Sequence, residues 1–117
     1  MGDGEQQEGQ IWEAAMEASH HKLDNLLGIV DCNRLQIDGA VADVMNVEPL
    51  EDKCRSVGWD VQRIDGHNMG EIVQALQNGK IACGKPKVIL ADTVKGKGVS
   101  FMTSLAGTGK HPAMTRC

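Results

Sequence analysis

The sequence of 117 residues lacks tyrosine altogether and contains a single phenylalanine. No apolar run comes near the roughly 18 residues that a membrane-spanning helix requires, so no membrane partner is expected. An excess of positive charge is also missing, because 12 Lys and Arg stand against 16 Asp and Glu, a net charge of −4. Proteins that grip a nucleic-acid backbone are basic, and we therefore expect no nucleic-acid partner.

Cysteine motifs are missing as well. Cys32, Cys54, Cys83 and Cys117 show no C-x-x-C spacing, and no secretory signal precedes them. A disulfide scaffold is therefore not expected, and the pattern favours reduced thiols in the cytoplasm. Apolar residues make up 41% and charged residues 24%, which is ordinary for a folded globular domain and excludes a disordered or collagen-like chain.

Glycine is abundant, with 14 residues, and indicates turns where the backbone approaches something closely. Between the glycines, helical and strand periods alternate. The pattern predicts helices over residues 10–22, 48–57 and 69–76, a helical turn over 40–46, and strands over 25–32, 59–64 and 86–94. The first strand (NLLGIVDC) is almost continuously apolar, which predicts burial on both faces. This order predicts an α/β fold, a partial doubly wound parallel sheet flanked by helices.

Both ends of the sequence look incomplete for such a fold. The chain opens on a glycine-rich loop with no strand before it, although loops of this kind normally follow a strand. After Met102 the apolar period and the charge pattern stop. We therefore expect a partial domain over residues 1–102 and a tail of different character over residues 103–117. An unpaired sheet edge would then favour self-association.

One candidate site joins Gly2-Asp3-Gly4 to Asn33. The two glycines let the backbone approach a ligand that the Asp3 carboxylate faces. Asn33 comes just after a predicted strand, where ligands gather in open α/β sheets. A carboxylate, an amide oxygen and a backbone carbonyl are hard oxygen ligands suited to Mg²⁺ or Ca²⁺. Gly-Asp-Gly alone is more often a simple turn, and it is the spacing to Asn33 that favours a metal site.

Residues 2–39, GDGEQQEGQIWEAAMEASHHKLDNLLGIVDCNRLQIDG, closely resemble the thiamine diphosphate binding segment of transketolases. The resemblance continues through PLEDKCRSVGWDV, DGHN and KPKVILADTVKGKGVSFM to about Met102. It is strongest toward the amino-terminal subunit of split transketolases from bacteria and archaea. Decarboxylating dehydrogenases of 2-oxo acids and deoxyxylulose phosphate synthase share the Gly-Asp-Gly to Asn spacing, but the WDV and KGKGVSFM stretches favour transketolase.

The resemblance implies a role for individual residues of the candidate site. The divalent metal would be bound by the side chains of Asp3 and Asn33 and by the backbone carbonyl of Leu35. Gly2 and Gly4 match the glycines of the cofactor-binding turn, where the Gly4 amide approaches the diphosphate. Ile37 matches a residue that packs against the thiazolium ring.

The catalytic candidates are Glu8 and Glu13, which match acidic positions near the subunit interface that link the two cofactor sites of the family dimer. Carboxylates at the start of a helix are also favoured by its dipole without any catalytic role, so both explanations stay open. His67 in DGHN is interpreted as a turn residue. Residues 95–98 (KGKG) fit a phosphate-binding turn and a plain loop equally well.

The resemblance implies transfer of a two-carbon ketol unit between sugar phosphates, with thiamine diphosphate as cofactor. The family takes the glutamate that assists the cofactor's aminopyrimidine from a following pyrimidine-binding domain. That domain is not in this sequence, so the chain alone is expected to be inactive. It could complete a site in trans with a carboxyl-terminal transketolase subunit, in a homo-oligomer. The alternative is a recruited, non-catalytic oligomeric module that binds metal or phosphate.

The tail over residues 103–117 departs from the family, whose next segment contains Trp-His-Gly and then Ala-Pro. Synonymous codons exist for this tail that, read in a shifted frame after one added A, encode NIPGWHGQAPSNDEV. That string is the missing family segment. We therefore expect a frameshifted tail, which sequencing the gene across codon 103 would test.

Overall fold

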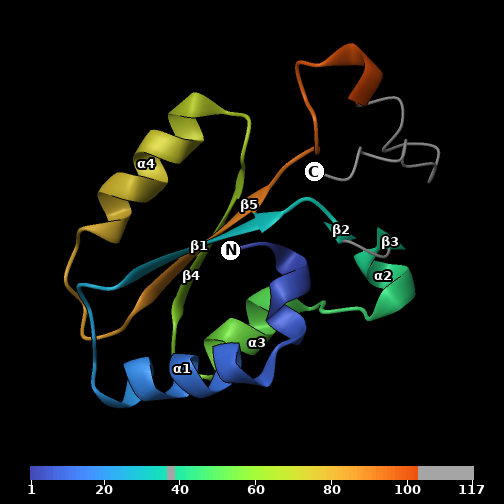
Figure 1. Cartoon of the computed structure of the whole chain (residues 1–117). Coiled ribbons are helices and arrows are strands. Elements are labelled where there is room, and N and C mark those ends of the chain that lie inside the picture. Colours follow the sequence, from blue (N-terminus) through green and yellow to red (C-terminus); the bar gives the residue numbers. More distant parts are fainter. Residues whose placement is uncertain (37–38, 103–117) are drawn as a thin grey trace, which may run out of the picture.

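The computed structural model describes residues 1–36 and 39–102, and a parallel sheet of three strands lies at its centre. The strands are β1 (Leu27–Cys32), β4 (Asp60–Asp65) and β5 (Lys87–Asp92), in the order β1-β5-β4. Lys87 pairs with Leu27 on one side and with Asp60 on the other, so all three strands start and end together. The predicted parallel α/β fold is confirmed (Figure 1).

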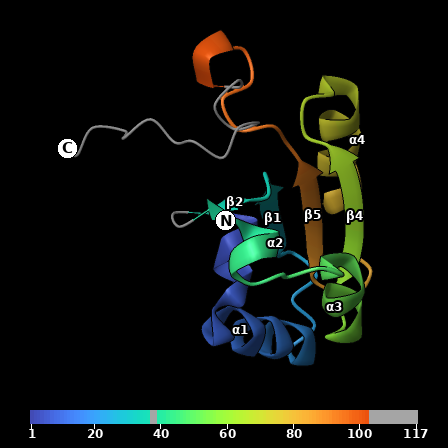
Figure 2. The same cartoon turned by 90° about the vertical axis from the view of Figure 1, so that its right-hand side faces the viewer.

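Helices cover both faces of the sheet. On one face lie α1 (Gly9–His20) and α3 (Leu50–Ser56), and on the other lies α4 (Met69–Gly79) (Figures 1 and 2). The remaining elements are short: η1 (Asp3–Gln7), a 3-10 helix, then β2 (Leu35–Gln36), β3 (Gly39–Ala40) and α2 (Val41–Val44). The strands β2 and β3 form an antiparallel pair, in which Leu35 lies opposite Ala40 and Gln36 opposite Gly39.

The core lies between the sheet and the face that α1 and α3 cover. Its buried side chains come from all three strands and from α3: Val30, Cys32, Leu50, Cys54, Val61, Val88 and Leu90. Trp12 of α1 and Trp59 pack against this cluster, and the Trp59 indole N–H donates to the carbonyl of Ala15 at 2.8 Å. That bond joins α1 to the start of β4, so the two layers are held by both apolar burial and a directed contact.

Burial of β1 on both faces was predicted, and this prediction is wrong. Val30 is 1% exposed, whereas its neighbour Ile29 is 48% exposed. Side chains alternate across a strand, so the two residues point to opposite faces. The face of Ile29 is left open because α4 packs against β4 and β5 at the far side of the sheet.

The outer edge of β1, expected to be unpaired, is partly paired by the first two residues of the chain. The Met1 ammonium donates to the carbonyl of Ile29 at 2.9 Å, and the amide of Asp31 donates to the Met1 carbonyl at 2.8 Å. Gly2 forms a parallel bridge with Asp31. These contacts of Met1 and Gly2 with β1 set the direction of the chain that follows them.

Candidate functional site

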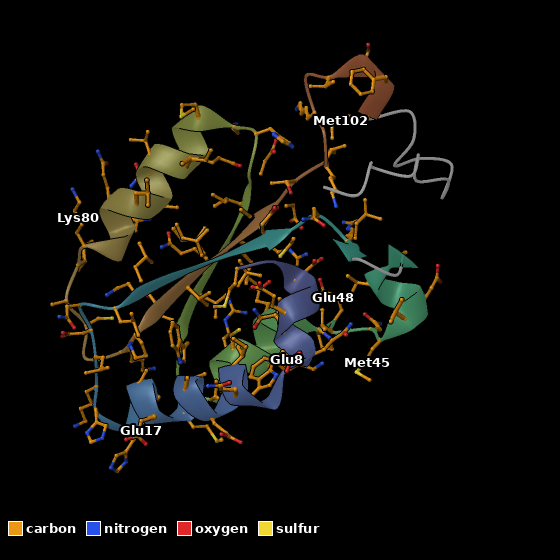
Figure 3. All side chains as sticks on the ribbon, viewed as in Figure 1. Glu8, Glu17, Met45, Glu48, Lys80 and Met102 are labelled. Atoms are coloured by element: carbon orange, nitrogen blue, oxygen red, sulfur yellow. The ribbon has the colours of Figure 1, made fainter. Side chains whose placement is uncertain are left out.

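The position of Asp3 is set by the strand-like pairing of Met1 and Gly2 beside β1. This pairing delivers Asp3 to the carboxyl end of β1 as the first residue of η1. At the other end of η1, the Gln7 side-chain amide donates to the carbonyl of Met45 at 2.8 Å. Figure 3 labels Met45 beyond α2, on the side of the molecule where η1 lies. The 3-10 helix is thus anchored at both ends.

The carboxylate of Asp3 is 4% exposed and touches the segment that carries Asn33. Its Oδ1 accepts a hydrogen bond from the Gly4 amide at 2.9 Å, and its Oδ2 accepts one from the Arg34 amide at 2.8 Å. Residues separated by 31 positions are thereby brought together. Arg34 adopts a left-handed conformation with φ 63°, which few non-glycine residues do, and such backbone is common at binding sites.

The Asn33 side chain is oriented from both ends. Its Oδ1 accepts from the Leu35 amide at 2.9 Å, and its Nδ2 donates to Asp31 Oδ2 at 3.1 Å. Asp31 in turn accepts a hydrogen bond from the Thr93 hydroxyl at the end of β5. The Asp3 carboxylate and the amide oxygen of Asn33 are therefore held by the backbone amides of two consecutive residues, Arg34 and Leu35.

These residues fit a hard divalent cation. Asp3 is a buried carboxylate, and within residues 1–36 and 39–102 no Lys or Arg side chain pairs with it. A buried charge is costly unless a counter-charge or a metal accompanies it. The same described residues hold no cluster of three His, Cys, Asp or Glu side chains for a metal. The oxygen donors available here are one carboxylate and neutral amide or carbonyl oxygens. Mg²⁺ is commonly bound by such a small set of protein oxygens, with water and phosphate oxygens as its other ligands.

Of the three expected cofactor-binding residues, the structure describes Gly2 and Gly4. Gly4 lies against Asp3, since its amide donates to that carboxylate. A Cβ on Gly2 would meet nothing within 4 Å in the protein itself, so the chain has no internal steric need for glycine there. Ile37 lies outside the described residues, as does the tail over residues 103–117.

Glu8 and Glu13 are both exposed, but they lie at different positions relative to the start of α1. Glu8 is the N-cap residue of α1 and makes no side-chain capping hydrogen bond (Figure 3). Glu13 falls in the second turn of α1, beyond the first turn where the helix dipole acts most strongly. The dipole explanation therefore weakens for Glu13, and the catalytic roles of both residues stay predictions.

A cleft of about 710 Å³ opens at the carboxyl ends of the three strands, beside Asn33. Arg34, Lys95 and Lys97 line it, and among the described side chains none of these three cations forms an ion pair. The cleft, which Asn33 and Leu35 also line, contains the carboxylates of Asp65 and Asp92 as well, but Arg63 pairs with Asp92. The net charge of the lining is therefore positive and favours an anion. Residues 95–98 were considered from the sequence as a phosphate-binding turn. Arg34 was not identified from the sequence, because it belongs to no recognisable binding motif.

The opposite wall of the cleft contains the DGHN turn, whose interpretation as a turn is confirmed. The His67 amide donates to Asp65 Oδ1 at 2.9 Å, and Asn68 caps α4 by accepting from the Glu71 amide at 3.2 Å. The His67 ring accepts at Nε2 from the Val94 amide at 2.8 Å, which fixes the ring beside β5. Cys32 also lines the cleft, but burial raises the pKa of its thiol to about 12, so it is not a nucleophile at neutral pH.

Arg63 of β4 joins two acidic residues next to the cleft. Its guanidinium donates to both oxygens of Asp92, at 2.9 and 2.8 Å, and to Glu48 Oε1 at 3.1 Å. The hydrogen bond from Arg63 holds the pKa of Asp92 below its usual value. Burial acts to raise the pKa of Glu48, but hydrogen bonds from the Leu50 amide and Arg63 lower it overall. The negative charge of Asp92 is thereby neutralised at the cleft rim.

Arg63→Met is expected to lower the free energy of unfolding by about 1 kcal/mol at pH 7, a value reduced for partial exposure of the side chains. Because the pKa values of Asp92 and Glu48 are lowered from 3.8 and 4.5 by folding, these pairs contribute stability above those values and lose it as pH falls through the lowered ones. The difference between variant and wild type should therefore shrink below about pH 4 in urea unfolding curves. Arg55→Met, which removes a single pair with Glu51 within α3 from an arginine that is itself exposed, is the control and should change little. A pH-independent difference would contradict this account.

Comparison with known proteins identifies the family. The family described as "Transketolase, thiamine diphosphate binding domain" matches residues 1–113 of this sequence. The chain belongs to the transketolase family. The 6-deoxy-6-sulfo-D-fructose transketolase subunit SqwG of Clostridium sp. (strain MSTE9) is 56% identical over 101 residues, which are 86% of this chain and 37% of that protein. An apulose-4-phosphate transketolase subunit of Phocaeicola vulgatus is 45% identical, over 91% of this chain and 38% of that protein.

Solved transketolase structures share the fold. The transketolase of Campylobacter jejuni superposes with a TM-score of 0.75 and 40% identity over 83% of this chain, which is 15% of that chain. A Pichia stipitis transketolase variant in complex with fructose-6-phosphate gives a TM-score of 0.78 and 30% identity, again over 15% of its chain. This transketolase-family chain thus spans a little over a third of the curated relatives it matches. No helix among its described residues is long and apolar enough to cross a membrane.

Proposed function

We propose that this chain is the metal and diphosphate half of a transketolase site, with its partner half on a separate carboxyl-terminal transketolase subunit. The observation that carries the proposal is the 2.8 Å hydrogen bond from the Arg34 amide to the buried Asp3 carboxylate, next to Asn33. It brings two oxygen-bearing side chains from distant segments to the carboxyl end of β1, where ligands gather in sheets of this kind.

In this assignment Asp3, Asn33 and the Leu35 carbonyl hold Mg²⁺ or Ca²⁺, and the metal binds the diphosphate of thiamine diphosphate. Gly2 and Gly4 allow close approach of the backbone, and Ile37 packs against the cofactor ring. Thiamine diphosphate supplies the carbon–carbon bond chemistry when it is bound. The protein's own contribution is to position the diphosphate against a buried carboxylate.

The substrates we propose are sugar phosphates, between which a two-carbon ketol unit is transferred. Arg34, Lys95 and Lys97 support this, because they supply positive charge to the cleft beside Asn33 and form no ion pair within residues 1–36 and 39–102. Glu8 is exposed at the start of α1 and Glu13 is exposed within α1. We propose that a second copy of the chain in a homo-oligomer contacts them there. The thiols of Cys32, Cys54 and Cys83 are free, which supports a cytoplasmic location.

A mixing experiment tests the proposal. The chain alone, with thiamine diphosphate and Mg²⁺, should show negligible ketol transfer, because the glutamate that assists the aminopyrimidine belongs to the partner half. Adding a carboxyl-terminal transketolase subunit should raise the rate at least about a hundredfold, the lower end of what one acid–base group contributes. The same mixture with the Asp3→Asn chain is the control and should stay near background.

Two outcomes would contradict the proposal. One is full ketol transfer by the chain alone, which would show that no partner half is needed. The other is an inactive mixture together with Mg²⁺ or Ca²⁺ binding that is indifferent to thiamine diphosphate. That second result would instead establish the non-catalytic metal-binding module.

A further inference from the structure

His67 lies where β4 and β5 end, and its ring continues the hydrogen bonding between these strands. The Gly66 amide donates to the carbonyl of Asp92, the last residue of β5, at 2.8 Å. Two residues further along, the Val94 amide donates to His67 Nε2, also at 2.8 Å. The imidazole therefore provides the acceptor that the backbone of a longer β4 would provide in a parallel ladder.

The turn that carries His67 is itself closely held against β5. The His67 amide donates to Asp65 Oδ1 at 2.9 Å, which fixes the backbone of the turn. A Cβ on Gly66 would lie 2.6 Å from Thr93 Cγ2 and 3.0 Å from the Asp92 carbonyl oxygen. Real side chains do not come so close, so the glycine is what lets this turn approach β5. The ring is thus brought to Val94 by a turn with little freedom to move.

Val94 begins the turn that carries two of the cations of the cleft. Its carbonyl accepts a hydrogen bond from the Lys97 amide at 3.1 Å, which closes a turn of four residues. Lys95 and Lys97 of this turn line the cleft. Val94 is 51% exposed, so apolar burial contributes little to holding the start of the turn. The hydrogen bond from its amide to His67 therefore has a large share in setting where the two lysines lie.

The bond between His67 and Val94 requires one form of the imidazole. A neutral imidazole has one nitrogen that donates and one that accepts, whereas both nitrogens donate in the protonated ring. Since Nε2 accepts from the Val94 amide, the ring in this arrangement is neutral and carries its proton on Nδ1. The position of this proton is a spectroscopic signature of the contact.

We propose that His67 is a positioning residue for phosphate binding in the cleft: by holding the Val94 amide, it keeps Lys95 and Lys97 at the cleft wall. The inference rests on the proposed function, because it takes the cleft as the site for the phosphate group of a sugar phosphate. The lysines bind the phosphate. His67 raises the fraction of molecules in which both lysines are placed to do so, and the apparent affinity rises with that fraction.

The test measures binding of inorganic phosphate to the full chain without Mg²⁺, at constant ionic strength and at pH 8, where imidazoles are neutral. The backbone amide signals of Gly96 and Gly98 in NMR report on the turn. His67→Leu removes the acceptor and should weaken phosphate binding about fivefold, as expected when one neutral hydrogen bond is lost. His67→Gln places an oxygen acceptor about where Nε2 lies and should restore most of the affinity. The side chain of His67→Asn is too short to reach the Val94 amide and should not restore it.

Two controls separate positioning from direct contact and from general effects of losing a histidine. His21→Leu makes the same change at an exposed histidine that pairs with Glu17, and it should leave phosphate affinity unchanged. In a chain that already carries Lys95→Gln and Lys97→Gln, His67→Leu should weaken phosphate binding no further, because His67 acts through these lysines.

The protonation state of the ring is measured separately. Nitrogen-15 spectra of the imidazoles should show the proton of His67 on Nδ1 in the wild type. The sequence contains four histidines, and the signals of His67 are those that disappear in His67→Gln.

Three results would overturn the role of His67 and leave the proposed function standing. They are a proton on Nε2 in the wild type, equal phosphate affinity in His67→Leu and wild type, and a fivefold loss that persists without the two lysines. If the Gly96 and Gly98 signals of the wild type do not respond to phosphate, both this inference and the cleft as a sugar phosphate site are wrong. Should His67→Leu fail to fold, the comparison of His67→Gln with His67→Asn decides, and equal affinities in those two variants would count against the proposal.

Discussion

Asp3→Asn is expected to weaken the binding of thiamine diphosphate in the presence of Mg²⁺ by at least tenfold. Asn has the size of Asp but lacks its charge, and a hard cation depends on the carboxylate. The position is 4% exposed and forms two backbone hydrogen bonds, so the side chain is already held where a metal would meet it. Isothermal titration calorimetry of wild type and variant measures the difference.

Asn33→Ala should weaken the same binding by about tenfold, because it removes an oxygen and the contacts that orient it. Asp43→Asn is the matched control, since Asp43 is an exposed carboxylate in α2. Circular dichroism and thermal midpoints without ligand show whether each variant folds. Unchanged affinity in a folded Asp3→Asn protein would refute the metal assignment.

Leu90→Ala should lower the free energy of unfolding by about 3–4 kcal/mol, the range for a fully buried leucine. Leu90 is 0% exposed and lies in the central strand β5, between β1 and β4. Total stabilities of domains are about 5–15 kcal/mol, so this one change removes a large share. Urea unfolding monitored by tryptophan fluorescence measures it.

The control for this prediction is Leu23→Ala, which makes the same chemical change at a side chain that is 41% exposed. It should cost about 1 kcal/mol or less, because little buried apolar area is lost. Equal losses in the two variants would mean that β5 is not the centre of the core.

Most helices and strands of the fold could be predicted, because the spacing of apolar residues and the positions of glycines depend on local structure. The strand expected over residues 86–94 is β5, and the helix expected over 48–57 is α3, with Pro49 as its N-cap residue. Exposure was less predictable. The run at residues 25–32 looks doubly buried, yet Ile29 is open to solvent because the covering helix α4 sits over the other strands.

The site was predictable in part. Asp3 and Asn33 were identified from their residue types and spacing, and the structure brings the Asp3 carboxylate to the residue next to Asn33. The cations Arg34, Lys95 and Lys97 meet only because the carboxyl ends of parallel strands lie at one edge of the sheet. The left-handed backbone of Arg34 also has no signal in the sequence, since arginine rarely adopts it.

The order of amino acids by itself determined the α/β class, the family resemblance and the oxygen-bearing candidates, because each depends on residue type and short-range period. Only the tertiary structure decided which of these side chains are neighbours. The pairing of Met1 and Gly2 with β1 and the hydrogen bond that binds Asp3 to the Arg34 amide both depend on contacts between segments distant along the chain. Such contacts are set by packing of the whole sheet and its helices, which no local pattern records.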